Sequence, residues 1–195
     1  MKQEIAKTIS YLFIPPINLL ITFIVLANQI YVDPELKIYT IIVALIFGFI
    51  LPIAVFVYLR KKGKIINDDA TIKDERMLPY VIGLGLAINA LILSFVFELH
   101  PLIIALWFAY IIIQLVMIIT NIYWKISAHL IGVGIPFATF LFLFQSDAIY
   151  LILIPIIVGW ARLTLKVHTP MQVIFGFLLG VLPTYFILSE SIRLL

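Results

Sequence analysis

Residues 101–123 read PLIIALWFAYIIIQLVMIITNIY and contain no charged side chain. A helix needs roughly 20 consecutive apolar residues to cross the hydrocarbon core of a bilayer. Within that core, a helix satisfies all of its backbone hydrogen bonds inside one segment. This stretch therefore predicts a membrane-spanning helix.

Similar apolar runs fill most of the chain. Of its 195 residues, 64% are hydrophobic and only 12% are charged, whereas soluble domains are about 45–50% apolar and about 25% charged. This composition excludes a water-soluble globule. We expect an all-α, polytopic integral membrane bundle of six to seven transmembrane helices, which forms a single transmembrane domain over residues 1–195. The runs cover residues 9–31, 38–59, 79–98, 101–123, 128–146, 148–165 and 170–189.

Two places in this pattern predict irregular helices. Pro15-Pro16 lies inside the first run and either kinks that helix or marks its start. The fifth and sixth runs, 128–146 and 148–165, are the shortest and are compatible with a pair of tilted or interrupted helices.

The basic residues indicate which way the chain crosses the membrane. With seven spans, the N-terminus and the segments near 60–78, 124–127 and 166–169 fall on one side. Cytoplasmic segments are enriched in Lys and Arg, so we expect this side to face the cytoplasm in a multi-pass protein of the bacterial inner membrane. The other side holds only Lys37 and Arg193. The basic residues on the first side are Lys2, Lys7, Arg60, Lys61, Lys62, Lys64, Lys73, Arg76, Lys125, Arg162 and Lys166.

Five polar residues within or beside the runs fall on this same side: Arg76, Ser127, His129, Arg162 and His168. Ionisable groups in such places are costly and are functional candidates by default. The third, fifth and seventh helices begin on this side, so their positive dipole ends converge with the two arginines. Helix N-termini and arginine side chains bind anions, which makes phosphate the expected ligand.

Each of these residues also has a simpler structural explanation. Ser127 is at a position typical of a helix cap. Arg162 and Lys166 lie four residues apart and can extend to lipid headgroups. His129 can be a core histidine bonded to a carbonyl group. The 60–64 basic run is typical of an orientation signal that touches anionic lipid.

Three short segments carry these polar residues in a fixed order. They are Arg76-Met77-Leu78-Pro79, then Ile126-Ser127-Ala128-His129, then Ala161-Arg162 followed by five residues, His168, three residues and Gln172. This pattern resembles the type 2 phosphatidic acid phosphatase superfamily. The family motifs are Lys, six residues, Arg-Pro; Pro-Ser-Gly-His; and Ser-Arg, five residues, His, three residues, Asp. The resemblance implies a phosphatase-like core over about residues 60–185.

The resemblance also implies a role for each residue. His168 would be the nucleophile that forms a phosphohistidine, and His129 the general acid that protonates the leaving alcohol. Arg76, Ser127 and Arg162 would bind the phosphoryl oxygens. This chemistry requires no metal and no other cofactor, because preorganised donors stabilise the charge on the phosphoryl group. The expected partners are a lipid phosphate substrate and membrane lipids, with no nucleic acid, and the oligomeric state is open.

The chain departs from the family pattern at several positions. Asp69 stands seven residues before Arg76, where the family has Lys, and Lys73 is a candidate substitute in phosphate binding. Gln172 replaces the Asp that would accept a hydrogen bond from the nucleophilic histidine and stabilise its positive charge. In the serine-protease template, replacing the orienting Asp by an amide lowers kcat about ten-thousandfold.

These departures leave two other functions open. One is a catalytically impaired relative that binds a lipid phosphate or acts as a scaffold in the membrane. The other is an intramembrane prenyltransferase, suggested by Asn67-Asp68-Asp69 and Asp74, since such enzymes hold magnesium diphosphate with Asp-rich motifs. A second Asp-rich motif is absent from the sequence, so we interpret residues 67–75 as a solvated acidic loop. The absence of cysteine excludes disulfides and cysteine-bound metals.

Overall fold

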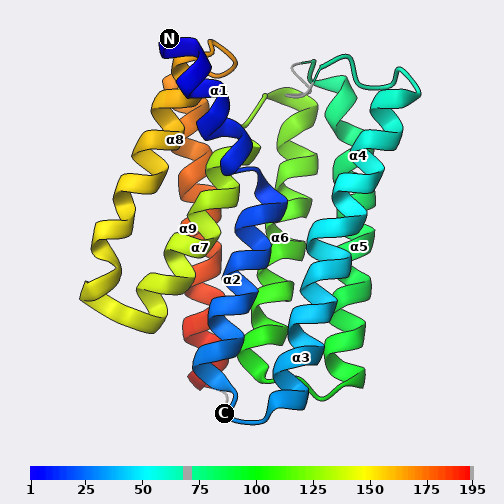
Figure 1. The fold of residues 1–195 in the computed structure, drawn as a ribbon, viewed down its shortest axis with the longest axis vertical. Helices are drawn as coiled ribbons and strands as arrows, with labels where there is room; N and C mark the ends of the chain where they lie inside the picture. The colour runs from blue at the N-terminus through cyan, green and yellow to red at the C-terminus, as the bar shows by residue number, and fades with distance from the viewer. Residues whose placement is uncertain (68–71, 194–195) are drawn as a thin grey trace.

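The structure is a computed structural model that describes residues 1–67 and 72–193 (Figure 1). The described residues form helices and no strand, which confirms the all-α prediction. The longer elements are joined by the π-helix η1 (Ala44–Ile50) and the 3-10 helices η2 (Asp74–Arg76) and η3 (Gln145–Ile152). The α-helices are α1 (Lys2–Leu12), α2 (Pro15–Ile30), α3 (Pro34–Val43), α4 (Leu51–Lys61), α5 (Met77–Val96), α6 (Pro101–Tyr123), α7 (Ala128–Phe144), α8 (Leu153–Thr164) and α9 (Pro170–Arg193).

Five helical segments are long and apolar enough to cross a membrane, or six when the bent pair α1–α2 counts as one span. One of the five, Ala128–Thr164, is a hairpin rather than a single rod. Its chain turns at η3, where Gln145 has a positive φ of 52°, and α8 then runs back along α7 (Figure 1). The two arms of this hairpin correspond to the fifth and sixth apolar runs of the sequence. That each helical segment crosses a bilayer stays a prediction.

The helices alternate in direction, so the segments of the predicted site meet at one end of the bundle. The N-terminus, the start of α5 and the segments 124–127 and 165–169 lie at the upper end in Figure 1. The turns at 31–33 and 97–100 lie at the opposite end (Figure 1). We call the upper end the site end. Its predicted cytoplasmic location stays a prediction.

The Pro15-Pro16 pair starts a new helix, as the sequence suggested. α1 ends at Leu12, α2 begins at Pro15, and their axes meet at 48°. Ile14 is extended (φ −64°, ψ 146°), as expected for a residue before proline. The Asn18 side-chain amide donates to the Phe13 carbonyl at 2.8 Å and holds this corner. The bend leaves α1 at the site end, where it packs against α8.

Close packing of α7 against α9 fixes the centre of the site. A Cβ at Gly180 would lie 2.6 Å from the Ile131 carbonyl oxygen, and one at Gly176 would lie 2.7 Å from the Ser127 carbonyl oxygen. Glycines at such contacts let two helix backbones approach closely. The two helices start at the same end, so this packing brings the segment around Ser127 against the first turns of α9 (Figure 1).

Candidate functional site

His168 is held by the first turn of α9. Its Nδ1 donates to Gln172 Oε1 at 3.2 Å. The same oxygen accepts from the Thr169 backbone N–H at 3.1 Å, and Thr169 Oγ1 accepts from the Gln172 N–H at 3.4 Å. Thr169 and Gln172 thus form a reciprocal capping box at the start of the helix. Gln172 therefore has two functions: it caps α9 and it orients the His168 ring.

Ser127 is the N-cap residue of α7, but its side chain makes no capping hydrogen bond. Its side chain is fully buried, and its hydroxyl has no hydrogen-bond partner in the described part of the chain. The backbone N–H donates to the Gln172 carbonyl at 3.3 Å, which ties the start of α7 to the start of α9. The helix-cap explanation of Ser127 therefore holds for its position and backbone but not for its side chain, and the buried hydroxyl lies behind the cavity wall.

Arg76 is anchored to the same segment. It ends η2 directly before α5, and its Nη1 donates to the Ile126 carbonyl at 3.2 Å. The side chain is only 4% exposed, yet it contributes to the wall of a cavity. Three helix starts, those of α5, α7 and α9, are thus joined through residues 126–127, as the sequence predicted.

Arg162 and His129 are both fixed by Ser10 of α1. Arg162 is 1% exposed, and its Nη1 donates to Ser10 Oγ at 3.1 Å. This burial excludes the alternative in which Arg162 extends to lipid headgroups. The His129 ring is hydrogen-bonded to the backbone of Ser10. The simpler explanation of His129, a ring bonded to the backbone, therefore holds, but the ring also lines the cavity.

His168 is surrounded by positive charge. Burial and the charges of Arg76, Arg162 and Lys125 lower the pKa of His168 to about 3, against the opposing effect of its hydrogen bond to Gln172. The imidazole is therefore neutral at physiological pH. A neutral ring that donates from Nδ1 keeps a lone pair on Nε2, which is the state a nucleophile needs.

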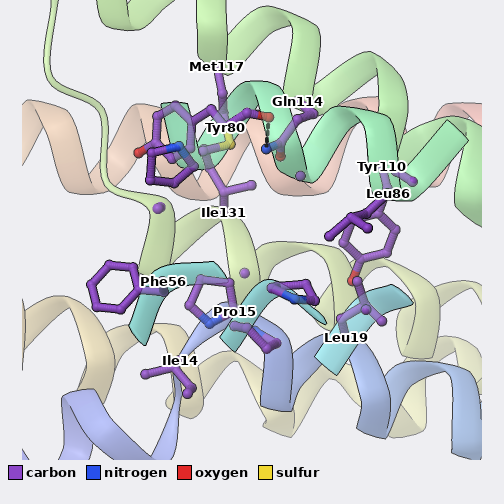
Figure 2. Close-up of a pocket in the computed structure, with 18 of the residues that line it drawn as sticks. Ile14, Pro15, Leu19, Phe56, Tyr80, Leu86, Tyr110, Gln114, Met117 and Ile131 are labelled. Atoms are coloured by element: carbon purple, nitrogen blue, oxygen red, sulfur yellow. Dashed lines mark hydrogen bonds between the residues drawn. The ribbon is translucent and has the colours of Figure 1, made fainter. Parts of the chain in front are cut away.

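A cavity of about 420 Å³ opens beside these residues. Arg76, His129 and His168 line one end of it, and most of the remaining wall is apolar. Figure 2 shows part of this wall, with Pro15 and Leu19 of α2 facing Tyr80 and Leu86 of α5. Arg162, Ser127 and Gln172 do not line the cavity. Gln172 is hydrogen-bonded to His168, which does line it, and Arg162 to Ser10, which precedes the lining residue Tyr11. Ser127 precedes the lining residue Ala128.

Lys73 does not join this cluster. Its ammonium donates to the Ile122 carbonyl at 2.6 Å, and its own carbonyl accepts from the Asn121 side chain at 3.0 Å. Lys73 therefore binds the C-terminal turn of α6, where a cation complements the helix dipole. Lys125, in contrast, is close enough to His168 for its charge to lower the pKa of that histidine.

The structure describes only part of the acidic segment 67–75. Asp68 and Asp69 lie outside the described residues. Among the residues that the structure describes, no group of three His, Asp or Glu side chains could hold a metal ion.

Three features of the site were missing from the sequence-based prediction. Ser10 gave no signal, because it lies on a helix far from every motif. Lys125 lies in the same segment as Ser127 and His129 and could have been found from that spacing. The Thr169-x-x-Gln172 capping box was visible as a motif of Ser or Thr followed three residues later by Glu or Gln.

The chain was compared with protein-family models, curated proteins and solved structures. None of the three comparisons gave a match. The likeness to the phosphatase superfamily therefore rests on the motif residues alone.

Proposed function

We propose that this chain is an integral-membrane lipid-phosphate phosphatase that hydrolyses a phosphomonoester or diphosphate through a phosphohistidine at His168. The observation that carries the proposal is the arrangement at one end of the cavity. There, a neutral His168 oriented by Gln172 lies in the field of two buried arginines, beside His129.

The reaction follows from these groups. His168 Nε2 attacks phosphorus, and the bond between phosphorus and the lipid oxygen breaks. His129, protonated when the anionic substrate is bound, gives its proton to the leaving oxygen. Water then attacks phosphorus with the neutral His129 as the base, so that the bond between His168 Nε2 and phosphorus breaks, inorganic phosphate leaves and His129 is protonated again. Arg76, which lines the cavity, stabilises the charge on the phosphoryl oxygens, and the buried Arg162 adds its positive charge from behind the wall.

The first test is phosphate release by the purified protein in detergent micelles with a metal chelator present. Phosphatidic acid and a polyprenyl diphosphate serve as the two substrates. We expect turnover that survives chelation, disappears in His168→Ala and persists in His100→Ala, a matched control at the opposite end of the bundle. Turnover that requires magnesium and ignores His168 would contradict the histidine mechanism and favour the prenyl-diphosphate alternative.

A binding or scaffold protein is the second candidate. It is favoured by Gln172, which caps α9 without supplying the negative charge that a phosphohistidine cation needs. Lipid phosphate that binds to folded protein without turnover on either substrate would support this function.

We propose that the site end faces the cytoplasm. The cysteine-free chain allows a direct test, in which Lys62→Cys at the site end and Val32→Cys at the opposite end are labelled separately with an impermeant maleimide. In intact cells, we expect labelling of Val32→Cys alone, since the site-end thiol would then be inside. The reverse pattern would place the site outside.

A further inference from the structure

The cavity extends from the charged site into the middle of the bundle. Along α5, its wall runs from Arg76 to Ala87, and along α6 from Met117 to Trp107. At 1.5 Å per residue, either path is about 15 Å long. Half of a bilayer's hydrocarbon core, which is about 30 Å thick, has the same depth. The cavity therefore matches the depth of one leaflet.

A buried aromatic pair forms the floor of this cavity of about 420 Å³. At the deep end, Trp107 is 1% exposed and stacks on Phe23 with ring centroids 4.4 Å apart.

The charges on the wall match an anionic head and an apolar tail. Arg76, His129 and His168 stand at the site end. No acidic side chain is among the described residues of the lining. The one side-chain amide in the wall, Gln114, donates from Nε2 to the Tyr80 carbonyl at 2.9 Å, so this donor group is already paired (Figure 2).

We propose that this cavity holds the hydrocarbon tail of the lipid phosphate, with Trp107 as the floor that limits chain length. The head group lies at the site described above, so this inference rests on the proposed phosphate site. Affinity therefore rises with chain length until the tail meets the floor.

The test uses Trp107 as the reporter of a bound chain. Trp124→Phe and Trp160→Phe leave it as the single tryptophan of the chain. The probes are alkyl phosphates with a terminal bromine, which quenches indole fluorescence on contact. Chains of about 6 to 18 carbons bracket the roughly 15 Å depth of a leaflet. We expect quenching to rise with length, reach a maximum and then stop rising.

Two variants locate the chain. Ala87→Leu fills the deep half of the cavity, and we expect it to move the length of maximal quenching to shorter chains by a few carbons. Ile88→Phe adds bulk at the neighbouring exposed position, which does not line the cavity, and serves as the matched control. An unchanged length dependence in Ala87→Leu would overturn the proposal.

Other outcomes separate this inference from the proposed function. Quenching that is independent of chain length, or equally strong with bromoalkanes that lack phosphate, would overturn the chain site even where phosphate release is observed. Length-dependent quenching without any phosphate release would support the chain site and refute the phosphatase.

Discussion

Replacing Gln172 by Glu tests how the site handles charge. The capping box accepts Glu as well as Gln, so the substitution keeps the shape of the first turn of α9. A negative charge at a helix N-terminus is also favourable. The change thus puts a carboxylate oxygen where Oε1 now lies, 3.2 Å from His168 Nδ1.

The size of the effect follows from this distance. Two unit charges 3.2 Å apart attract by about 5 kcal/mol at an effective dielectric constant of 20. One pKa unit corresponds to 1.36 kcal/mol, so the pKa of His168 rises from about 3 to at most about 7. The same attraction stabilises the positively charged phosphohistidine. We expect kcat to rise at least about tenfold, with the ten-thousandfold effect of the serine-protease template as the upper limit.

Phosphate release across pH and NMR titration of labelled histidine measure both effects. In Gln172→Glu, we expect the rate to fall below about pH 7, because the raised pKa protonates the nucleophile. The native protein has no such His168-dependent fall above about pH 4, since the pKa of His168 is about 3. Met171→Glu, which adds the same charge at an exposed neighbouring position, is the matched control. A raised His168 pKa without a gain in kcat would refute the reasoning.

Three further substitutions test the framework of the site. Ser10→Ala removes the oxygen that accepts a hydrogen bond from Arg162 Nη1. We expect kcat/KM to fall about tenfold, because a hydrogen bond to a charged group contributes about 1.5–3 kcal/mol. Ser10→Thr keeps the hydroxyl and should retain most of the activity. Gly180→Ala places a methyl group 2.6 Å from a carbonyl oxygen of α7. We expect the free energy of unfolding in detergent to fall by about 1–3 kcal/mol. An unchanged free energy of unfolding would show that α7 and α9 can move apart to admit the methyl group. Lys73→Met removes the ammonium group that donates to the Ile122 carbonyl. We expect the rate of phosphate release to change less than threefold. A loss of activity as large as that of Arg76→Met would show that Lys73 binds phosphate.

The local features of the fold were predictable because they depend on short stretches of sequence. Apolar composition requires helices, and Pro15 and Pro170 each begin one. The site end was predictable as well, since alternating helices place the segments before α5, α7 and α9 together. The hairpin at 128–164 was expected only in outline, because its turn at Gln145-Ser146-Asp147 contains no proline like those that begin α2 and α9.

The sequence by itself determined the helical class, the order of the motif residues and the end of the bundle where they meet. Only the tertiary structure decided that Ser10 contacts Arg162, 152 positions away, that Lys73 binds the end of α6, and that the cavity runs one leaflet deep beneath His168. The physical reason is the range of each interaction. Helix formation follows from neighbouring residues in the sequence. A side-chain contact or a cavity depends instead on how separate helices pack. Glycines such as Gly180 determine that packing through contacts with residues distant in the sequence.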